Sequence, residues 1–537
     1  MNTLENIIEN CFNALGKFLR PEQLFLGLLF VLGGLSIILF NTQVFPVNPA
    51  YALFYFFLLV LLGLYRPALL WQAVIFFLAF ELVTAVELGG AAIRIYQFGT
   101  MALLLASILL LLQGKVILPR FRWFDIALVA LLVGAILSFF ANSLPVESSK
   151  QLLVLVFFGF VYGAGRLYVR SKQDWKNFLV TLQVSGVVVA LYALYQAVAF
   201  KYQQAHFMVM EGRPNSVFEE ADWLGFFLGV VALIAIFRFL QTRKIFSEVL
   251  AAILVVLFVL TLILTVSRSA WLGFAAGVIF VILCMLLQYF SGFLHTKKSD
   301  YRTLGKLLAG IPFLLALSIF LVSLLGLTRF DLDQRALSTA SGNQEITIAC
   351  SESAHSPAFV QFVEELGSLG CQHIDLEERE AYLQDGYEIR TTERPDPNID
   401  IRQDLYRQSF TLLKEHPVFG IGWGESLKAF GTDGRGAGLN SSNMFLEVWL
   451  GTGLLGILGF SFFWFGLLIA GLKRLFRKRE MTDGFWITLL VLTLWIHVTI
   501  FNLFNSGLLL GTFGAFLILA SWYLEKAAPR IKNLWQK

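Results

Sequence analysis

Residues 249–288 read VLAAILVVLFVLTLILTVSRSAWLGFAAGVIFVILCMLLQ, two long apolar runs separated only by a polar turn at Ser267-Arg268-Ser269. An apolar run of about 20 residues can cross the hydrocarbon core of a membrane as a helix. Such runs recur along all 537 residues, of which 57% are hydrophobic and 15% charged, against about 25% charged in an ordinary soluble chain. The pattern excludes one large soluble core and predicts an all-α polytopic membrane protein.

The apolar runs predict 12 to 14 transmembrane helices. The expected spans are approximately 22–40, 50–64, 67–86, 96–113, 124–141, 151–169, 177–199, 223–240, 246–266, 270–292, 307–327, 443–470, 485–501 and 507–524. Before them, residues 1–21 place apolar side chains at helical spacing, which favours an amphipathic helix on the inner membrane surface over a span, with a partner-binding helix as the alternative. The expected organisation is 1–21 interfacial helix, 22–327 N-terminal spans, 328–441 large loop, 442–524 C-terminal spans and 525–537 tail.

The orientation follows from the short loops, because Lys and Arg are retained on the cytoplasmic side. With 14 spans, every strongly basic loop falls on one side together with both termini. These basic loops are 115–122, 170–176, 238–244, 297–306 and 473–479, and the alternate loops carry few or balanced charges. We therefore expect both termini to be cytoplasmic and the loop 328–441 to lie on the outer face.

The long loop holds 19 acidic and 10 basic residues and is the only extended polar stretch. EITIAC (345–350), SPAFVQFVEELGSLG (356–370) and CQHIDL (371–376) predict a small βαβ-like subdomain, with ERPDPNID (393–400) as a linker. Cys350 and Cys371 stand at the two strand–helix junctions, so a disulfide is possible in an oxidising compartment. The histidines near these cysteines match no compact zinc pattern.

Three arginines occupy the expected outer border: Arg213, Arg268 and Arg402. One arginine at a helix end can be explained by snorkelling towards the interface. Three together favour an anion site, because the planar guanidinium offers a fork of donors matched to phosphate oxygens. A lipid-linked diphosphate at the outer leaflet would suit them. A transporter would instead need buried polar groups near the midplane, for which Glu81 and His497 are the clearest candidates.

Several motifs together resemble the O-antigen ligase/polymerase superfamily of bacterial membrane glycosyltransferases. They are RPNSVFEEADWLGFFL (213–228), LTVSRSAWLG (264–273), R-x3-Y-x9-HPVFGIGWG (402–424) and SSNMFLEVWLGTGLLGILGF (441–460). Each motif alone is weak, but their order, spacing and membrane position are specific. The resemblance covers about 213–460.

The resemblance implies metal-independent transfer of glycan from an undecaprenyl-diphosphate carrier on the outer face of the bacterial inner membrane. Arg268 and Arg402 match the family arginines that would neutralise the departing diphosphate. Members of the ligase branch usually carry His-Asn where this chain has Ser442-Asn443, and serine cannot replace histidine as a base at neutral pH. Glu447 and His416 are the alternative bases. Substrate contacts are expected from Arg213, Asn440, Ser442 and Asn443.

The departure from His-Asn favours a polymerase of O-antigen or exopolysaccharide, and a ligase transferring glycan to lipid A-core or another acceptor is the alternative. A flippase for lipid-linked glycan is the alternative from another class. It would need cationic groups along the membrane interior rather than at the outer border. The expected partners are the lipid-linked glycan, a glycan or lipid acceptor and membrane lipids, with no nucleic acid and no cofactor.

Overall fold

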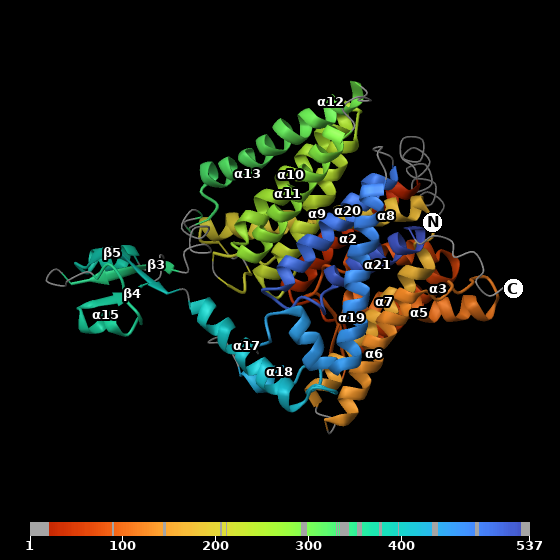
Figure 1. The fold of residues 1–537 in the computed structure, drawn as a ribbon, viewed down its shortest axis with the longest axis horizontal. Helices are drawn as coiled ribbons and strands as arrows, with labels where there is room; N and C mark the ends of the chain where they lie inside the picture. The colour runs from red at the N-terminus through yellow and green to blue at the C-terminus, as the bar shows by residue number, and fades with distance from the viewer. Residues whose placement is uncertain are drawn as a thin grey trace, which may run out of the picture.

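The computed structural model describes residues 21–527 except 89–90, 143–145, 205–206, 211, 292–297, 329, 331, 333–342, 352–356, 375–378, 396, 432–438 and 478–482. The expected interfacial helix 1–21 and most of the tail therefore lie outside the described residues. The chain is a bundle of long helices from which one small sheet projects (Figure 1). The bundle helices are α2 Pro21–Asn41, α3 Pro49–Tyr65, α4 Pro67–Phe77, α5 Ile95–Leu112, α6 Trp123–Ala141, α7 Val146–Tyr168, α8 Lys172–Lys201, α9 Ala221–Gln241, α10 Ile245–Leu264, α11 Arg268–Ser291, α12 Lys298–Gly305 with a π-helical turn Lys306–Gly310, α13 Ile311–Leu325, α19 Met444–Arg477, α20 Asp483–Asn502 and α21 Gly511–Ala527.

Eleven helices in the described part of the chain are long and apolar enough to cross a membrane, which confirms the polytopic helical class. The other three of the 14 expected spans are shorter, because α3, α4 and α21 have 17, 11 and 17 residues. The expected span 67–86 is wrong in its second half. There α4 ends at Phe77, and the chain continues into an antiparallel hairpin of β1 (Thr84–Leu88) and β2 (Ala91–Arg94).

Protein rather than lipid buries the apolar residues after α4. Leu78, Phe80 and Val83 are all buried, and the Leu82 amide donates to the Val217 carbonyl at 2.9 Å. Irregular backbone at membrane depth is tolerated where other protein segments satisfy its polar groups. The apolar run 67–86 therefore correctly predicted that its residues are buried, but it did not predict the length of the helix.

Contacts between distant loops divide them into two groups that alternate along the chain. In one group the loops before α3, before α5, before α9, before α11 and after α20 contact one another. In the other group Arg166 pairs with Asp125 and Glu525, and Lys172 pairs with Asp483. The groups are the loops that the charge pattern predicts for the outer and inner faces, respectively. These contacts agree with the alternation of loops that the charge pattern predicts.

Helix α9 lies at the centre of the bundle, with 89% of its most apolar stretch buried. It packs against α8, α10, α11 and α20. His497 of α20 is fully buried at this centre, where its Nε2 lies 3.0 Å from the Phe226 carbonyl oxygen. A Cβ at Gly229 or Gly273 would approach the His497 ring within 3 Å, so these glycines make room for it. His497 therefore has a packing role between three helices.

The projecting sheet is a three-stranded antiparallel sheet in the order β4-β3-β5 (Figure 1). Its elements are β3 Asn343–Cys350, α15 Glu365–Ser368, β4 Cys371–His373, α16 Arg379–Gln384 and β5 Glu388–Pro395. The expected βαβ topology was wrong, because a βαβ unit joins parallel strands whereas β3 and β4 are antiparallel. The helix expected over 356–370 was too long, and only α15 forms there. The linker expected at 393–400 was also wrong. Its first residues end β5, and Pro397 begins α17 (Pro397–Glu415) at a position where proline is tolerated.

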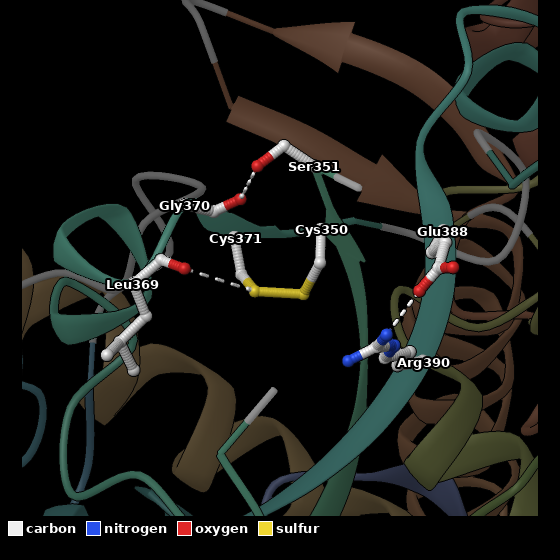
Figure 2. The surroundings of a disulfide bond; sticks show 7 residues. All are labelled: Cys350, Ser351, Leu369, Gly370, Cys371, Glu388 and Arg390. Carbon is white, nitrogen blue, oxygen red and sulfur yellow. Dashed lines mark hydrogen bonds and ion pairs between the residues drawn. A yellow bond between two sulfur atoms is a disulfide. The ribbon is translucent and has the colours of Figure 1, made fainter. Parts of the chain in front are cut away.

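The possible disulfide is confirmed (Figure 2). Cys350 and Cys371 are directly paired across β3 and β4, with their Cα atoms 4.0 Å apart. Both are buried in a small separate core with Ile346, Ile348 and Leu366. The bond thus closes the subdomain where its core is too small to hold the strands by burial alone.

Candidate functional site

Arg213 lies in the loop between α8 and α9 and is tied to the start of α11. Its Nε donates to the Thr265 carbonyl at 3.0 Å, and its Nη2 lies 3.2 Å from the Asp222 carboxylate. Asp222 is in the first turn of α9, where a carboxylate is also favoured by the helix dipole. Ser216 in the same loop is held by the Gln196 side chain and the Val189 carbonyl. Arg213 is therefore a fixed group that positions the turn before Arg268.

Arg268 begins α11 directly after a strained turn. Val266 has φ +53°, a conformation that is rare for a β-branched residue. The neighbouring Ser269 accepts a 2.6 Å hydrogen bond from Asn505, in the turn after α20. A Cβ at Gly225 would come within 3.1 Å of three atoms of this turn, so α9 approaches it closely. The turn that carries Arg268 is thus fixed from α9, from Arg213 and from Asn505.

Arg402 lies in the first part of α17, and its guanidinium is 5.5 Å from the centre of the Phe504 ring. One helical turn later, the Tyr406 hydroxyl donates to the Leu503 carbonyl at 3.1 Å. Cation–π stacking engages the face of the guanidinium, whereas its hydrogen bonds are made from the edge. Stacking therefore orients the arginine without competing for its N–H donors.

The three arginine segments form one continuous set of contacts. Arg213 binds the turn that carries Arg268, that turn binds Asn505, and Phe504 beside it binds Arg402. Segments nearly 200 residues apart in the chain are thus brought to one face of the bundle. Ser216 and Val266, two non-glycine residues with positive φ, lie in these segments. Backbone strain of this kind gathers at functional sites.

The loop 416–424, HPVFGIGWG, fits into a break in α19. The helix is interrupted at Gly453, which has φ +64° and ψ −166°. The Leu454 amide donates to the Val418 carbonyl, and the Ile421 amide donates to the Leu450 carbonyl, both at 2.8 Å. Backbone groups that a membrane helix loses at a break must find other partners. The loop 416–424 supplies those partners. Its glycine motif and the glycine motif of α19, which are separate in the sequence, therefore contact each other in the fold.

The glycines of both motifs are required by this contact. A Cβ at Gly420 would lie 2.2 Å from the Leu450 oxygen, and a Cβ at Gly453 would lie 2.1 Å from the Val418 oxygen. The Gly420 carbonyl also accepts from the Asn142 side chain after α6. The end of α17 is therefore anchored to the membrane helices α6 and α19.

Residues 440–447 form a closed turn before and into α19. The Glu447 carboxylate accepts hydrogen bonds from the Ser441 amide and hydroxyl and from the Ser426 hydroxyl in α18 (Ser426–Phe430). Asn443 caps α19 by accepting from two backbone amides, and Asn440 accepts from the Ser442 amide. Helix α17 packs on this end of α19 through Leu405, Leu446 and Leu450.

The structure does not bring His416 to the arginines. His416 is exposed at the far end of α17, 14 residues after Arg402. At 1.5 Å per residue, that distance along the helix axis is about 21 Å. The residues that the sequence pointed to therefore separate into an arginine group, a serine–glutamate turn and an isolated histidine.

Several residues of the site were not predicted from the sequence: Asp222, Thr265, Phe504 and the site contact of Asn505. A usable signal existed for Tyr406, because the R-x3-Y spacing puts Arg402 and Tyr406 on one helix face. No such signal existed for Phe504 and Asn505 in the turn after α20, because a sequence does not show which distant turn a helix end will contact.

Glu81, a candidate for an intramembrane relay, lies between α4 and β1 and is fully buried. It accepts a hydrogen bond from the Gly511 amide, the first residue of α21, at 3.1 Å. A carboxylate at a helix N-terminus stabilises the helix through its dipole. Nearby, Arg94 pairs with Glu219 in the loop between α8 and α9, which also contains Arg213. These contacts give Glu81 a structural role in seating α21.

Residues 253–461 match a family model described as O-antigen ligase. This part of the chain is similar to the O-antigen ligase family. The match includes Arg268, Arg402, the loop 416–424 and the 440–447 turn, and it confirms the resemblance that the motifs predicted. No curated protein matches the chain. The match and the apolar helices together support a membrane protein of the O-antigen ligase/polymerase type, a class that acts in polysaccharide biosynthesis.

Proposed function

We propose that the protein transfers glycan from an undecaprenyl-diphosphate carrier at the outer face of the bacterial inner membrane, as a polymerase of O-antigen or exopolysaccharide. The observation that carries the proposal is the continuous contact set joining the segments of Arg213, Arg268 and Arg402 at one end of the helix bundle. The charge pattern of the loops favours this end as the outer face.

In the reaction, an acceptor hydroxyl attacks the anomeric carbon of the donor sugar. A carbon–oxygen bond to the sugar forms as the bond to the diphosphate breaks, and the bonding electrons leave with the carrier diphosphate. The acceptor proton passes to a base or to water. Negative charge grows on the diphosphate, so fixed guanidinium groups stabilise the transition state more than the ground state. We assign this role to Arg268 and Arg402 without a metal ion.

Arg213 has a different role in the proposal. Its hydrogen bonds to the Thr265 carbonyl and to Asp222 hold the turn before Arg268, so it positions that arginine. The contacts of Glu447 with Ser441 and Ser426 likewise favour a role in holding the 440–443 turn, where Ser442 and Asn443 would meet the substrate. The distance of His416 from Arg402 disfavours it as the base.

The ligase is the second candidate, and Ser442 is the residue that disfavours it. It stands where the ligase branch has histidine, and a serine hydroxyl is not a base at neutral pH. A flippase is disfavoured because the arginines gather at one end of the helices rather than along their length. Lipid-linked intermediates in a deletion strain separate the two enzymes. Single unpolymerised units indicate a polymerase, and intact polymer left on its carrier indicates a ligase.

The test of the site is glycan transfer by purified Arg268→Ala and Arg402→Ala variants in proteoliposomes. Each should lose about 10²–10³ in turnover, the effect of one charge-assisted contact to a transition state. Arg268→Lys should also be impaired, because lysine keeps the charge but lacks the planar fork. Arg407→Ala is the matched control, since Arg407 is exposed on the same helix and pairs with Asp404, its neighbour three residues earlier. Wild-type rates in both alanine variants would refute the assignment.

A further inference from the structure

A cavity of about 530 Å³ lies between α5, α6 and α7, away from the arginine group. Its wall includes Gly159 and Gly163, which lie one turn apart on α7. Glycines at this spacing usually let two membrane helices approach closely. Here, within the described part of the chain, a Cβ built on either glycine would meet no atom within 4 Å. The pair therefore lines open space instead of a helix contact.

One end of the cavity is polar, and its charges belong to a connected network. Asp125, Tyr162 and Arg166 line this end. The Arg166 Nε lies 3.1 Å from Asp125, and the Tyr162 hydroxyl donates to the same carboxylate at 2.6 Å. Arg166 also pairs with Glu525 of α21. This network fixes α6, α7 and α21 together, and the rest of the wall is almost entirely apolar.

The loop between α5 and α6 forms the rim at the polar end. Leu118, Pro119 and Phe121 of this loop line the cavity, and Arg120 stands between them with an exposed side chain. The Arg166 Nη2 donates to the Arg120 carbonyl at 3.3 Å, which holds the loop in place. Lys115 and Arg170 are exposed beside it. Exposed apolar and basic side chains together are typical of a membrane surface with anionic headgroups.

The length of the cavity decides what fills it. Along α7 the lining runs from Leu155 to Leu167, which are twelve positions apart and therefore about 18 Å along the helix axis. One leaflet of the hydrocarbon core is about 15 Å thick, whereas a partner helix would need the whole ~30 Å. The cavity fits a chain that starts at the basic rim and ends near the membrane centre.

We propose that this cavity binds one acyl chain of an anionic phospholipid, with the headgroup phosphate at Arg120 on the rim. The site lies at the end of the bundle where the basic loops gather, which the charge rule favours as the cytoplasmic leaflet. Apolar burial holds the chain, and the exposed cations select the headgroup. The proposal is independent of the reaction catalysed at the opposite end.

The test is native mass spectrometry of the detergent-purified protein with added phosphatidylglycerol or phosphatidylcholine of the same acyl chains. The wild type should retain phosphatidylglycerol preferentially. Gly163→Leu should abolish retention, because the new side chain enters the cavity without a clash, and Gly159→Leu should do the same independently. Arg120→Gln should weaken phosphatidylglycerol binding about fivefold, the effect of one cation near a headgroup.

Two controls isolate the cavity and the charge. Gly34→Leu adds the same side chain at an open glycine on α2, and Arg243→Gln removes a cation from another loop at the same end. Both should bind like the wild type. Equal retention of the two lipids, displacement by inorganic phosphate, or undiminished binding in both cavity variants would overturn the proposal. A dimer that Gly163→Leu converts to monomer would overturn it too, because the occupant would then be a second copy.

Discussion

Replacing Gly453 with alanine should dislodge the loop 416–424 from the break in α19. The backbone at φ +64° and ψ −166° belongs to a region open essentially to glycine alone. In addition, the new Cβ would lie 2.1 Å from the Val418 oxygen. Relief requires the loop to move, which breaks the Leu454–Val418 hydrogen bond and weakens the Ile421–Leu450 hydrogen bond.

The size of the effect follows from these parts. The backbone conformation costs a non-glycine residue about 1–3 kcal/mol, and each of the two hydrogen bonds contributes about 0.5–1.5 kcal/mol. The free energy of unfolding should therefore fall by about 2–6 kcal/mol. Thermal unfolding in detergent, followed by tryptophan fluorescence, measures it. Gly34→Ala is the control, because a Cβ there meets nothing within 4 Å, and it should be neutral or slightly stabilising. A Gly453→Ala protein that unfolds at the wild-type temperature would refute the reasoning.

Two further predictions concern topology and the contact of Glu81 with α21. A single cysteine at Thr411 should react with an impermeant thiol reagent in intact spheroplasts and one at Gln173 should not; the reverse pattern would show that the loops are assigned to the wrong faces. Glu81→Ala removes the acceptor of the Gly511 amide hydrogen bond, so the free energy of unfolding should fall by about 1–3 kcal/mol. Thermal unfolding in detergent measures this change, and a Glu81→Ala protein that unfolds at the wild-type temperature would contradict the prediction.

The long apolar runs predicted the helices well because a membrane span needs a fixed length of apolar chain. The same rule failed after Phe77, where Leu78–Val83 is apolar apart from Glu81 but is buried against α2, the loop before α9 and α21. Hydrophobicity shows that a residue avoids water, and it does not distinguish lipid from protein as the alternative. The β1–β2 hairpin that follows was hidden for the same reason.

The sequence predicted the arginines of the candidate site but not the residues that hold them in place. An arginine at a membrane border is expensive wherever the chain folds, so Arg213, Arg268 and Arg402 stand out from local sequence alone. Phe504 and Asn505 do not, because their importance depends on a tertiary contact. The broken helix α19 was hidden as well. Its glycines suggested close helix packing, whereas Gly453 is required by its backbone conformation and by the loop that crosses it.

Helix α17 is held at both ends, and the glycine motifs form the contact at its second end. Near the start of the helix, Arg402 and Tyr406 hold it on the turn after α20, and the loop that follows the helix fits into the break of α19. Between these anchors, α17 packs on α19 through Leu405 and its neighbours. A soluble helix held at both ends has little freedom to move its first turn. In the proposed mechanism, the position of Arg402 relative to Arg268 therefore depends on a contact at the far end of the same helix, about 20 Å away.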